Sequence, residues 1–369
     1  MDYLKLSDCS DYSNKRTSNI QLETYISTEN MLPNKGGVVK AESIPDCKST
    51  SKYEPHDILL SNIRPYFCKI WYADKEGGCS NDVLVIKAKK GYLPKFLYYV
   101  LSDQNFFNYD TVTSKGTKMP RGSKNAIMKY LVPDVDIFTQ RRIASILSAY
   151  DNLIENNNKR IRLLEQMAEN LYKEWFVRFR FPGHEKVEME NGLPKGWKIK
   201  RYKEILTIKY GKGLETTKLT STGYPVFGSN GVIGFYTKYM YETPQVLISC
   251  RGASSGVVNI SLPFSFITSN SLVCERTRPN ELTFEYLKYY FLNTNLVQYQ
   301  TGSAQPQITI NNIEKLKFII PNIELQDEFA RITRRIDKEI LIIQQQTSLL
   351  TRQRDLLLPR LMSGKLEVK

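Results

Sequence analysis

Histidine is the scarcest residue with catalytic chemistry in this sequence: the 369 residues include only His56 and His184. Two histidines leave too little material for a histidine-based metal site or a catalytic triad. A glycine-rich phosphate loop is missing as well, because Gly364 and Lys365 lack the upstream glycine and the Ser or Thr that such a loop needs. These absences argue against a hydrolase or a nucleotide-binding enzyme.

Other catalytic motifs are also missing. No Gly-x-Gly-x-x-Gly pattern follows a strand, and the sequence has no Asn/Asp-Pro-Pro-aromatic motif of the kind that an amino-methyltransferase needs beside its target base. A metal-dependent nuclease would need clustered carboxylates, and Asp46 has no convincing partner acids. We therefore expect a protein that is not an enzyme and that holds no metal and no cofactor.

Cysteine and apolar runs are sparse too. The six cysteines show neither close pairing nor zinc spacing, so free thiols in a reducing cytosol fit best. No apolar run approaches the ~18 residues of a membrane span, and Met1 is followed by polar sequence rather than by a signal peptide. We expect a cytoplasmic protein that does not associate with membranes.

Positive charge is what the sequence has in excess. Lys and Arg number 52 against 38 Asp and Glu, a net charge of +14, which suits a polyanionic partner such as DNA. The excess is spread over segments expected to fold, with concentrations in residues 111–133 and 195–212. Lys115, Lys118, Arg121 and Lys124 follow Asp110 with no acid among them, so we expect these four charges to have no acid nearby. At 369 residues the chain is long enough for two or more domains.

Two long helices are predicted by heptad spacing. Between residues 140 and 181, and again after residue 326, apolar residues recur at steps of three and four, which is typical of helices packed along one another. We expect Pro182 and Gly183 to end the first helix, and Pro359 to kink or stop the second. The predicted seam consists of Ile143, Leu147, Ile154, Asn157, Ile161, Leu164, Leu171, Trp175, Ile336, Ile340, Ile343, Leu350 and Leu357.

The sequence also predicts an internal duplication. Gln140 aligns with Gln326, and Asp151 with Asp337, both at an offset of 186 residues. Strand-like segments, one short helix and a polar loop precede each long helix in the same order. The expected strands include Asp57 to Ile63 and Asp82 to Ala88 in the first half and Val246 to Ser249 in the second. Two unrelated amphipathic helices are the alternative, which the offset shared by the flanking segments disfavours. We expect strand-rich α+β domains over residues 1–136 and 184–322, each followed by a long helix, over 137–183 and 323–369.

Polar loops at matching places in the two halves supply candidate DNA contacts. Lys and Arg suit phosphates, whereas Arg, Asn and Gln can read base edges through paired hydrogen bonds. For any one of these residues, a solvated position in a turn is the simpler interpretation. As a set in equivalent positions, however, they favour a binding surface. The candidates are Asn62, Arg64, Lys69, Lys115, Lys118, Arg121 and Lys124 in the first half, and Lys212, Ser229, Asn230, Lys238, Arg251, Ser254, Gln305 and Gln307 in the second.

Several motifs together carry a family resemblance. They include DILLSNIRPYFCKIWYADKEGGCSNDVLV and GTKMPRGSKNAI in the first half, and YPVFGSNGVIGFY, ISCRGASSGVVN and GSAQPQITINNIEKLKFIIPNIELQ in the second. Over nearly its whole length the chain resembles the specificity subunit of type I restriction-modification systems. The helix IASILSAYDNLIENNNKRIRLLEQMAENLYKEWF is similar to the central spacer of that family.

The resemblance implies two target-recognition domains, each reading half of a split double-stranded DNA sequence. It implies that the two helices form an antiparallel coiled coil, which spaces the domains and docks two methyltransferase subunits. Those subunits would supply adenine methylation, and restriction subunits would supply ATP-driven translocation and cleavage. Two rival hypotheses are a coiled-coil adaptor that binds only protein and a DNA-modifying enzyme with an unfamiliar site.

Overall fold

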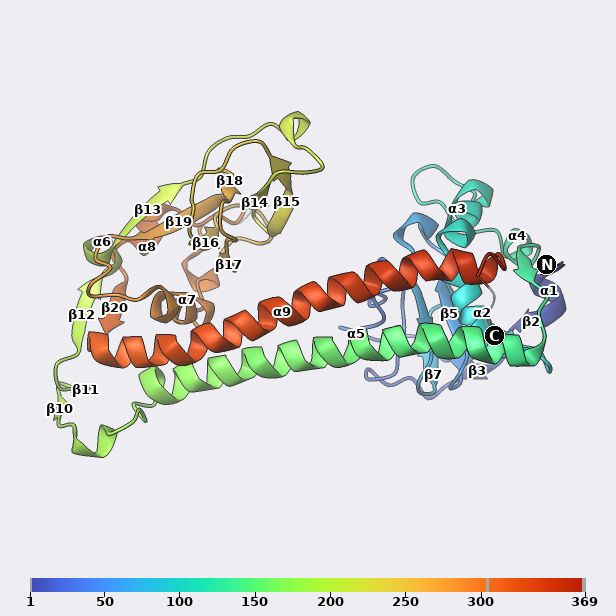
Figure 1. Cartoon of the computed structure of the whole chain (residues 1–369), viewed down its shortest axis with the longest axis horizontal. Coiled ribbons are helices and arrows are strands. Elements are labelled where there is room, and N and C mark those ends of the chain that lie inside the picture. Colours follow the sequence, from blue (N-terminus) through green and yellow to red (C-terminus); the bar gives the residue numbers. More distant parts are fainter. Residues whose placement is uncertain (1, 303–304, 367–369) are drawn as a thin grey trace. The chain divides into compact units, whose positions relative to one another are not determined.

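The computed structural model describes residues 2–302 and 305–366. It divides the chain into two compact units: unit 1 is Met1–Asn158 with Gln345–Lys369, and unit 2 is Lys159–Gln344. Each unit combines a strand-rich domain with one half of each long helix, α5 (Ile137–Tyr172) and α9 (Ile323–Met362) (Figure 1). The expected α+β class is confirmed, whereas the domain boundaries stay a prediction.

The first domain, in unit 1, is built on small antiparallel sheets. Its central sheet has the order β2-β8-β5-β6, flanked by the sheets β3-β4-β7 and β1-β9. The two middle strands, β5 and β8, are rich in β-branched and Leu residues, and their buried side chains form the core. The strands are β1 (Tyr3–Lys5), β2 (Ser10–Tyr12), β3 (Arg16–Thr17), β4 (Thr50–Tyr53), β5 (Ile58–Ser61), β6 (Ile70–Tyr72), β7 (Gly77–Cys79), β8 (Val83–Ala88) and β9 (Leu131–Pro133).

Short helices connect these strands. A 3-10 turn (Pro65–Phe67) lies between β5 and β6, and a loop of residues 114–123 precedes α4. Pro94 begins α2, where its missing N–H costs no hydrogen bond. The helices are α1 (Leu6–Cys9), α2 (Pro94–Leu101), α3 (Gln104–Thr113) and α4 (Lys124–Ile127).

The second domain, in unit 2, repeats the central sheet with the order β13-β19-β16-β17. Beside it lie the sheets β15-β14-β18 and β12-β20, together with a small hairpin, β10-β11. The strands are β10 (Met189–Glu190), β11 (Leu193–Pro194), β12 (Lys198–Arg201), β13 (Leu206–Tyr210), β14 (Tyr224–Gly228), β15 (Gly231–Tyr236), β16 (Val246–Ser249), β17 (Val258–Ile260), β18 (Phe266–Ile267), β19 (Ser271–Arg276) and β20 (Lys317–Ile320). The helices are α6 (Tyr202–Ile205), α7 (Phe284–Leu292) and α8 (Ile310–Ile313), with 3-10 turns at His184–Lys186, Thr216–Lys218 and Val297–Tyr299.

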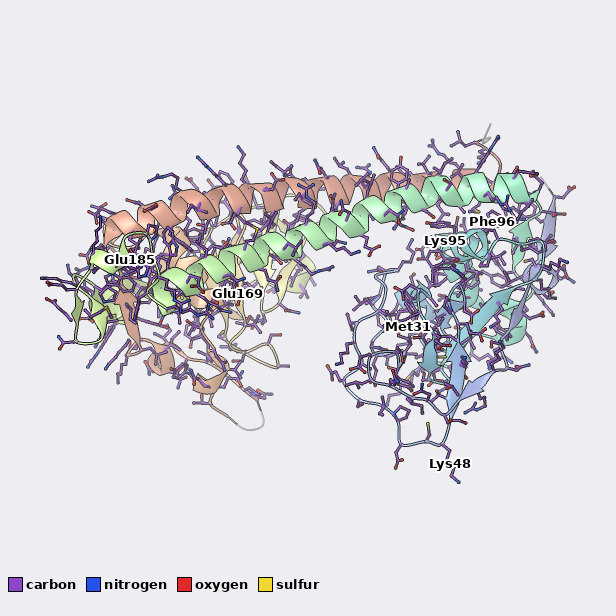
Figure 2. The ribbon with its side chains drawn as sticks, turned by 90° about the horizontal axis from the view of Figure 1, so that it is seen from below. Met31, Lys48, Lys95, Phe96, Glu169 and Glu185 are labelled. Atoms are coloured by element: carbon purple, nitrogen blue, oxygen red, sulfur yellow. The ribbon has the colours of Figure 1, made fainter. Side chains whose placement is uncertain are left out.

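Each domain packs against the ends of the long helices in its own unit. In unit 1, Leu147 of α5 and Leu358 of α9 are buried in one core with Phe96 of α2. Figure 2 shows Lys95 and Phe96 at the start of α2, beside the first half of α5. In unit 2, Trp175 joins Phe329 of α9 in the core of the second domain. These apolar contacts anchor each domain to its helix pair.

The two helices run antiparallel within each unit, as the resemblance implied. In unit 1, Arg354 of α9 lies 2.7 Å from Asp151 of α5, and in unit 2, Arg160 of α5 lies 2.9 Å from Glu339 of α9. All the predicted seam residues are buried or half-buried, whereas Leu163, one position before the seam residue Leu164, is 59% exposed. This pattern fits a heptad seam.

Both helix ends differ from the expectation. The first helix stops before Pro182: α5 passes into a π-helical turn (Lys173–Val177) that buries both Trp175 and Phe176. The extra residue in such a turn rotates the chain, so that two adjacent aromatic side chains enter the core together. Pro359 does not stop α9, which continues to Met362, while the alternative that it kinks the helix stays a prediction. Only the final turn follows this proline, so few helical hydrogen bonds are at stake.

No helix in the described part of the chain is both long and apolar enough to cross a membrane.

Candidate nucleic-acid interface

A closed loop of residues 115–121, called the first loop here, lies at one edge of the first domain. Lys115 and Arg121 close it through two backbone hydrogen bonds, each 2.9 Å between nitrogen and oxygen. Strand β5 leads into a segment that holds the loop in place, because Arg64 N donates to Pro120 O at 2.8 Å and Gly122 N donates to Asn62 O at 3.0 Å. The structure thus brings Asn62, Arg64, Lys115 and Arg121 together.

The second domain repeats this arrangement with different side chains. Thr301 and Gln307 pair through the same two backbone hydrogen bonds, again 2.9 Å each, and so close the second loop, of which the structure describes residues 301–302 and 305–307. Gly252 N donates to Pro306 O at 3.1 Å, and Ile308 N donates to Cys250 O at 3.0 Å. Arg121 of the first loop and Gln307 of the second therefore occupy equivalent positions, 186 residues apart. Both side chains are exposed.

The sequence suggested that none of the positive charges near the first loop has an acidic partner. The structure shows that one of them does. Lys115 and Lys118 of the loop, and Lys124 at the start of α4, are exposed, and within the described residues no carboxylate lies within ion-pair distance of them. Arg121, however, forms an ion pair with Asp82, which is 39 positions earlier in the chain: Arg121 Nη2 lies 3.2 Å from Asp82 Oδ1. The expectation of no nearby acid is therefore wrong for Arg121, because the fold brings the turn before β8 against the loop.

Arg64 and Lys69 face the interior more than expected. Arg64 is half-buried, and its backbone is left-handed, with φ of 51°. The Lys69 ammonium donates to Thr28 O at 2.6 Å, and burial lowers the pKa of Lys69. A lysine that is half-buried and already bonded to a carbonyl is poorly placed for a phosphate. The structure thus sets Lys69 apart from the exposed cations of the first loop.

Most candidates of the second domain gather at one edge of its sheets. The Ser229–Asn230 turn joins β14 to β15, and Ser229 O accepts a hydrogen bond from Asn259 Nδ2 at 3.3 Å. Lys212 lies two residues after the end of β13, and its backbone N donates to Ile267 O of β18 at 2.9 Å. Gly211 makes this approach possible, because a Cβ there would lie 2.3 Å from Thr268 O.

Arg251 joins this group directly. It forms an isolated bridge with Gln307, and a turn containing Ser254 follows it. Gln305 is exposed within the second loop. Lys238 lies apart, because it follows the end of β15 that is opposite to the Ser229–Asn230 turn.

A buried carboxyl group, that of Asp110, lies beside Gly122 at the end of the first loop, and the sequence did not single it out. Asp110 is fully buried, and both its oxygens, like Asn62 Oδ1, have no hydrogen-bond partner in the described part of the chain. They pack around Gly122, where a Cβ would lie 2.5 Å from Asp110 Oδ1 and 3.0 Å from Asn62 Oδ1. Burial raises the pKa of Asp110 to about 6. The residue of the second domain that is equivalent to Gly122 is Ile308, whose side chain is apolar and buried.

The arrangement offers recognition chemistry: exposed cations, amides and guanidinium groups on two equivalent loops. Across residues 2–302 and 305–366, no three His, Cys, Asp or Glu side chains gather in a way that could hold a metal ion.

Comparisons with known proteins give the family. Residues 10–166 and 194–352 each match the model of the type I restriction modification DNA specificity domain. The chain is 28% identical over 306 residues to the specificity subunit of the type I restriction enzyme MjaIX from Methanocaldococcus jannaschii, covering 76% of this chain and 71% of that protein. It is 22% identical over 432 residues to the HindI specificity subunit from Haemophilus influenzae, covering 93% of this chain and 94% of that protein.

A solved structure shares the fold. The S subunit of a type I restriction-modification system from M. genitalium aligns with a TM-score of 0.60 and 19% identity, covering 100% of this chain and 96% of that one. The family model matches one stretch in each half, and together these stretches span most of the sequence. This chain therefore belongs to the type I restriction modification DNA specificity family.

Proposed function

We propose that this chain is the DNA-recognition subunit of a type I restriction-modification complex, in which each strand-rich domain reads one half of a split sequence. The observation that carries the proposal is the repeated loop geometry: the first and second loops are closed by the same hydrogen bonds and carry exposed polar side chains. The net charge of +14 supports binding to DNA.

Different side chains on the same scaffold support different readings in the two halves. Arg121 stands where the second loop has Gln307. Arginine pairs best with guanine in the major groove, and glutamine pairs best with adenine. The exposed Lys115 and Lys118 suit phosphates, which position a protein on DNA without reading bases.

The helices are proposed to space the two readers and to dock methyltransferase subunits. Exposed apolar residues on both helices support docking: Leu153 and Leu163 of α5 are 51% and 59% exposed, and Leu349 of α9 is 61% exposed. The internal duplication supports two such subunits, since each unit repeats the same elements, with restriction subunits joining through the complex. Inserting one heptad into each helix should lengthen the gap between the half-sites and leave both half-sites unchanged.

The chain is proposed to supply recognition only, in the cytoplasm, while its partners supply the chemistry. The test is methylation of random-sequence plasmid DNA by the purified chain, by its methyltransferase partner, and by the two together. We expect adenine methylation at a bipartite sequence only in the mixture. Methylation by the chain alone would favour the modifying enzyme, and an absence of salt-dependent DNA binding would favour the protein-only adaptor.

A further inference from the structure

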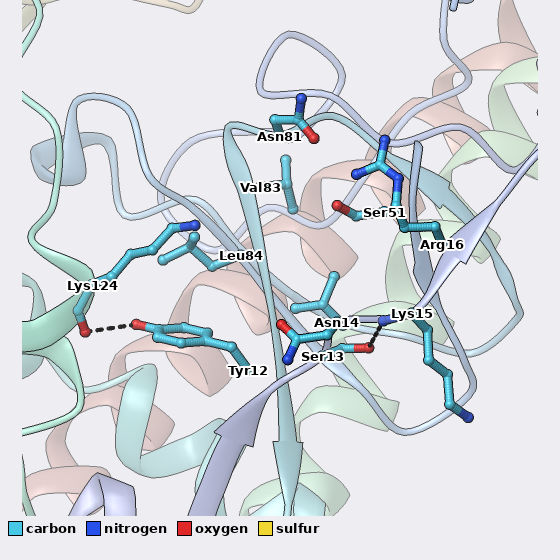
Figure 3. Close-up of a pocket in the computed structure, with 11 residues that line it drawn as sticks. Tyr12, Ser13, Asn14, Lys15, Arg16, Ser51, Asn81, Val83, Leu84 and Lys124 are labelled. Carbon is cyan, nitrogen blue, oxygen red and sulfur yellow. Dashed lines mark hydrogen bonds between the residues drawn. The ribbon is translucent and has the colours of Figure 1, made fainter. Parts of the chain in front are cut away.

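Beside the first loop, the surface of the first domain forms a polar hollow of about 480 Å³ (Figure 3). Strand β8 forms its floor through Val83, Leu84 and Val85. Figure 3 shows Arg16 and Lys124 on opposite sides of this strand. Two of the cations that bound the hollow therefore come from distant parts of the sequence.

Four polar side chains around the hollow are available to a ligand, whereas the ammonium of Lys15, which also lines it, is paired with Glu54 at 2.8 Å. Asn14 and Asn81 are exposed, and within the described residues their side-chain amides have no hydrogen-bond partner. Arg16 and Lys124 have no carboxylate within ion-pair distance in the same part of the chain. Ser49 orients Arg16 instead: Nε donates to Ser49 Oγ at 3.0 Å, and Nη2 donates to Ser49 O at 2.7 Å.

Neighbouring contacts hold the hollow in a fixed shape next to the first loop. Tyr12 donates its hydroxyl hydrogen to Lys124 O at 3.0 Å, which ties the end of the 114–123 segment to the central sheet (Figure 3). Asp82, adjacent to Asn81, lies 3.2 Å from Arg121 of the first loop. One surface thus includes both the hollow and the first loop.

The repeat adds independent support for Arg16. Tyr12 of β2 pairs with Ile86 of β8, and Ile208 of β13 pairs with Cys274 of β19, so the two residues are equivalent. Four residues later stand Arg16 in the first domain and Lys212 in the second. Both halves therefore place a cation just beyond the same strand, although sequence patterns alone had singled out only Lys212.

We propose that this hollow is the base-reading subsite of the first domain, and that Asn14 and Asn81 hydrogen-bond one A·T base pair while Arg16 and Lys124 bind the flanking phosphates. Two free amides match the donor and acceptor pattern of adenine in the major groove, and two unpaired cations match a nucleic-acid backbone. A small anion would engage the cations but would leave both amides without a function. This inference rests on the proposed function and adds residues to it.

The test uses the full complex of the chain with its methyltransferase partner. Methylome sequencing first gives the wild-type bipartite site, and a set of 30-base-pair duplexes then carries each single base-pair substitution of it. Asn81→Ala and Asn14→Ala should each reduce discrimination at one A·T position of one half-site by roughly 5- to 150-fold. The other half-site serves as the internal control. Arg16→Gln and Lys124→Ala should each lower the slope of log affinity against log salt by about 0.9 and leave base preference unchanged.

Lys90→Ala is the matched control for charge, because Lys90 is exposed beyond the opposite end of β8. A wild-type complex without a bipartite site would overturn the proposed function itself. If the wild-type site is bipartite and both asparagine variants keep full discrimination in both half-sites, the hollow is not a reading subsite. The same conclusion follows if the Arg16 and Lys124 variants match Lys90→Ala in salt dependence.

Discussion

Tyr99 of α2 donates its hydroxyl hydrogen to Asp151 of α5, with 2.6 Å between the two oxygens. The second half of the chain repeats this contact: Tyr289 of α7 donates to Asp337 of α9 at 3.0 Å. A cation joins each aspartate, Arg354 at 2.7 Å in unit 1 and Lys288 at 2.6 Å in unit 2. A tyrosine hydrogen bond and an ion pair to one aspartate, here called the polar joint, thus attach each domain to its long helix in addition to apolar packing.

Removing this hydroxyl should weaken the attachment of the domain. Tyr99→Phe deletes a hydrogen bond to a charged group, and we expect a loss of about 1.5–3 kcal/mol in the free energy of unfolding. Tyr66→Phe is the control, because Tyr66 is 49% exposed and its hydroxyl has no hydrogen bond in the described part of the chain. Chemical denaturation would measure both variants, and equal stability of the two would show that the joint contributes little.

Adjacent leucines on α5 separate the helix seam from the outer surface. Leu164 is half-buried, so Leu164→Asp should destabilise the protein by at least about 2 kcal/mol through an unpaired carboxylate in an apolar contact. Leu163→Asp should leave thermal unfolding nearly unchanged, because Leu163 is 59% exposed. We expect Leu163→Asp to weaken binding to the methyltransferase instead, as measured by co-purification. Similar melting temperatures for both variants would contradict the seam assignment.

Asp110 should make stability depend on pH. Burial raises the pKa of the Asp110 carboxyl from its ordinary value of 3.8 to about 6 in the folded state. The folded state therefore binds the proton more tightly than the unfolded state does. The stability that this proton contributes is complete below pH 3.8 and is lost as the pH rises towards 6.

Asp110→Asn removes this titration, so it should stabilise the protein at pH 7.5 by up to about 3 kcal/mol and should have little effect near pH 4. Denaturation curves at the two pH values would measure the difference. An equal effect of the substitution at both pH values would show that the Asp110 carboxyl does not titrate as its burial implies.

The exposed lysines of the first loop should act on phosphates. Lys115→Ala and Lys118→Ala should each lower the slope of log affinity against log salt by about 0.9, because one fewer counterion is released for each lost contact. Binding to the wild-type duplex would be measured for the full complex between about 50 and 200 mM salt. Slopes equal to that of Lys90→Ala would assign both lysines to a solvated turn.

Much of the fold could be predicted because local pattern and tertiary context agree. The runs around β5, β8 and β16 are apolar and β-branched, and each became a buried strand at the expected place. The offset of 186 residues correctly paired Gln140 with Gln326: Gln140 Oε1 accepts from Leu93 N at 2.8 Å, and Gln326 Oε1 accepts from Thr283 N at 3.0 Å. Duplication made each half a check on the other.

The remaining features depend on contacts between distant segments. No local pattern shows that Asp82 neutralises Arg121, or that Asn14 and Asn81 face one hollow. The end of α5 at a π-helical turn follows from the fit of Trp175 into the core of unit 2, whereas the sequence offered only the later Pro182 as a stop. Contacts between side chains that are distant in the sequence therefore determine these three features, and local sequence patterns do not show such contacts.

The central claim is that the first and second loops read separate halves of one DNA site. The most direct measurement is methylome sequencing of cells that carry the methyltransferase partner with wild-type chain, Arg121→Ala or Gln307→Ala. We predict that Arg121→Ala relaxes base preference in one half-site only, and that Gln307→Ala relaxes it in the other half-site only. Relaxation of the same half-site by both variants, or of both half-sites by either variant, would contradict the account.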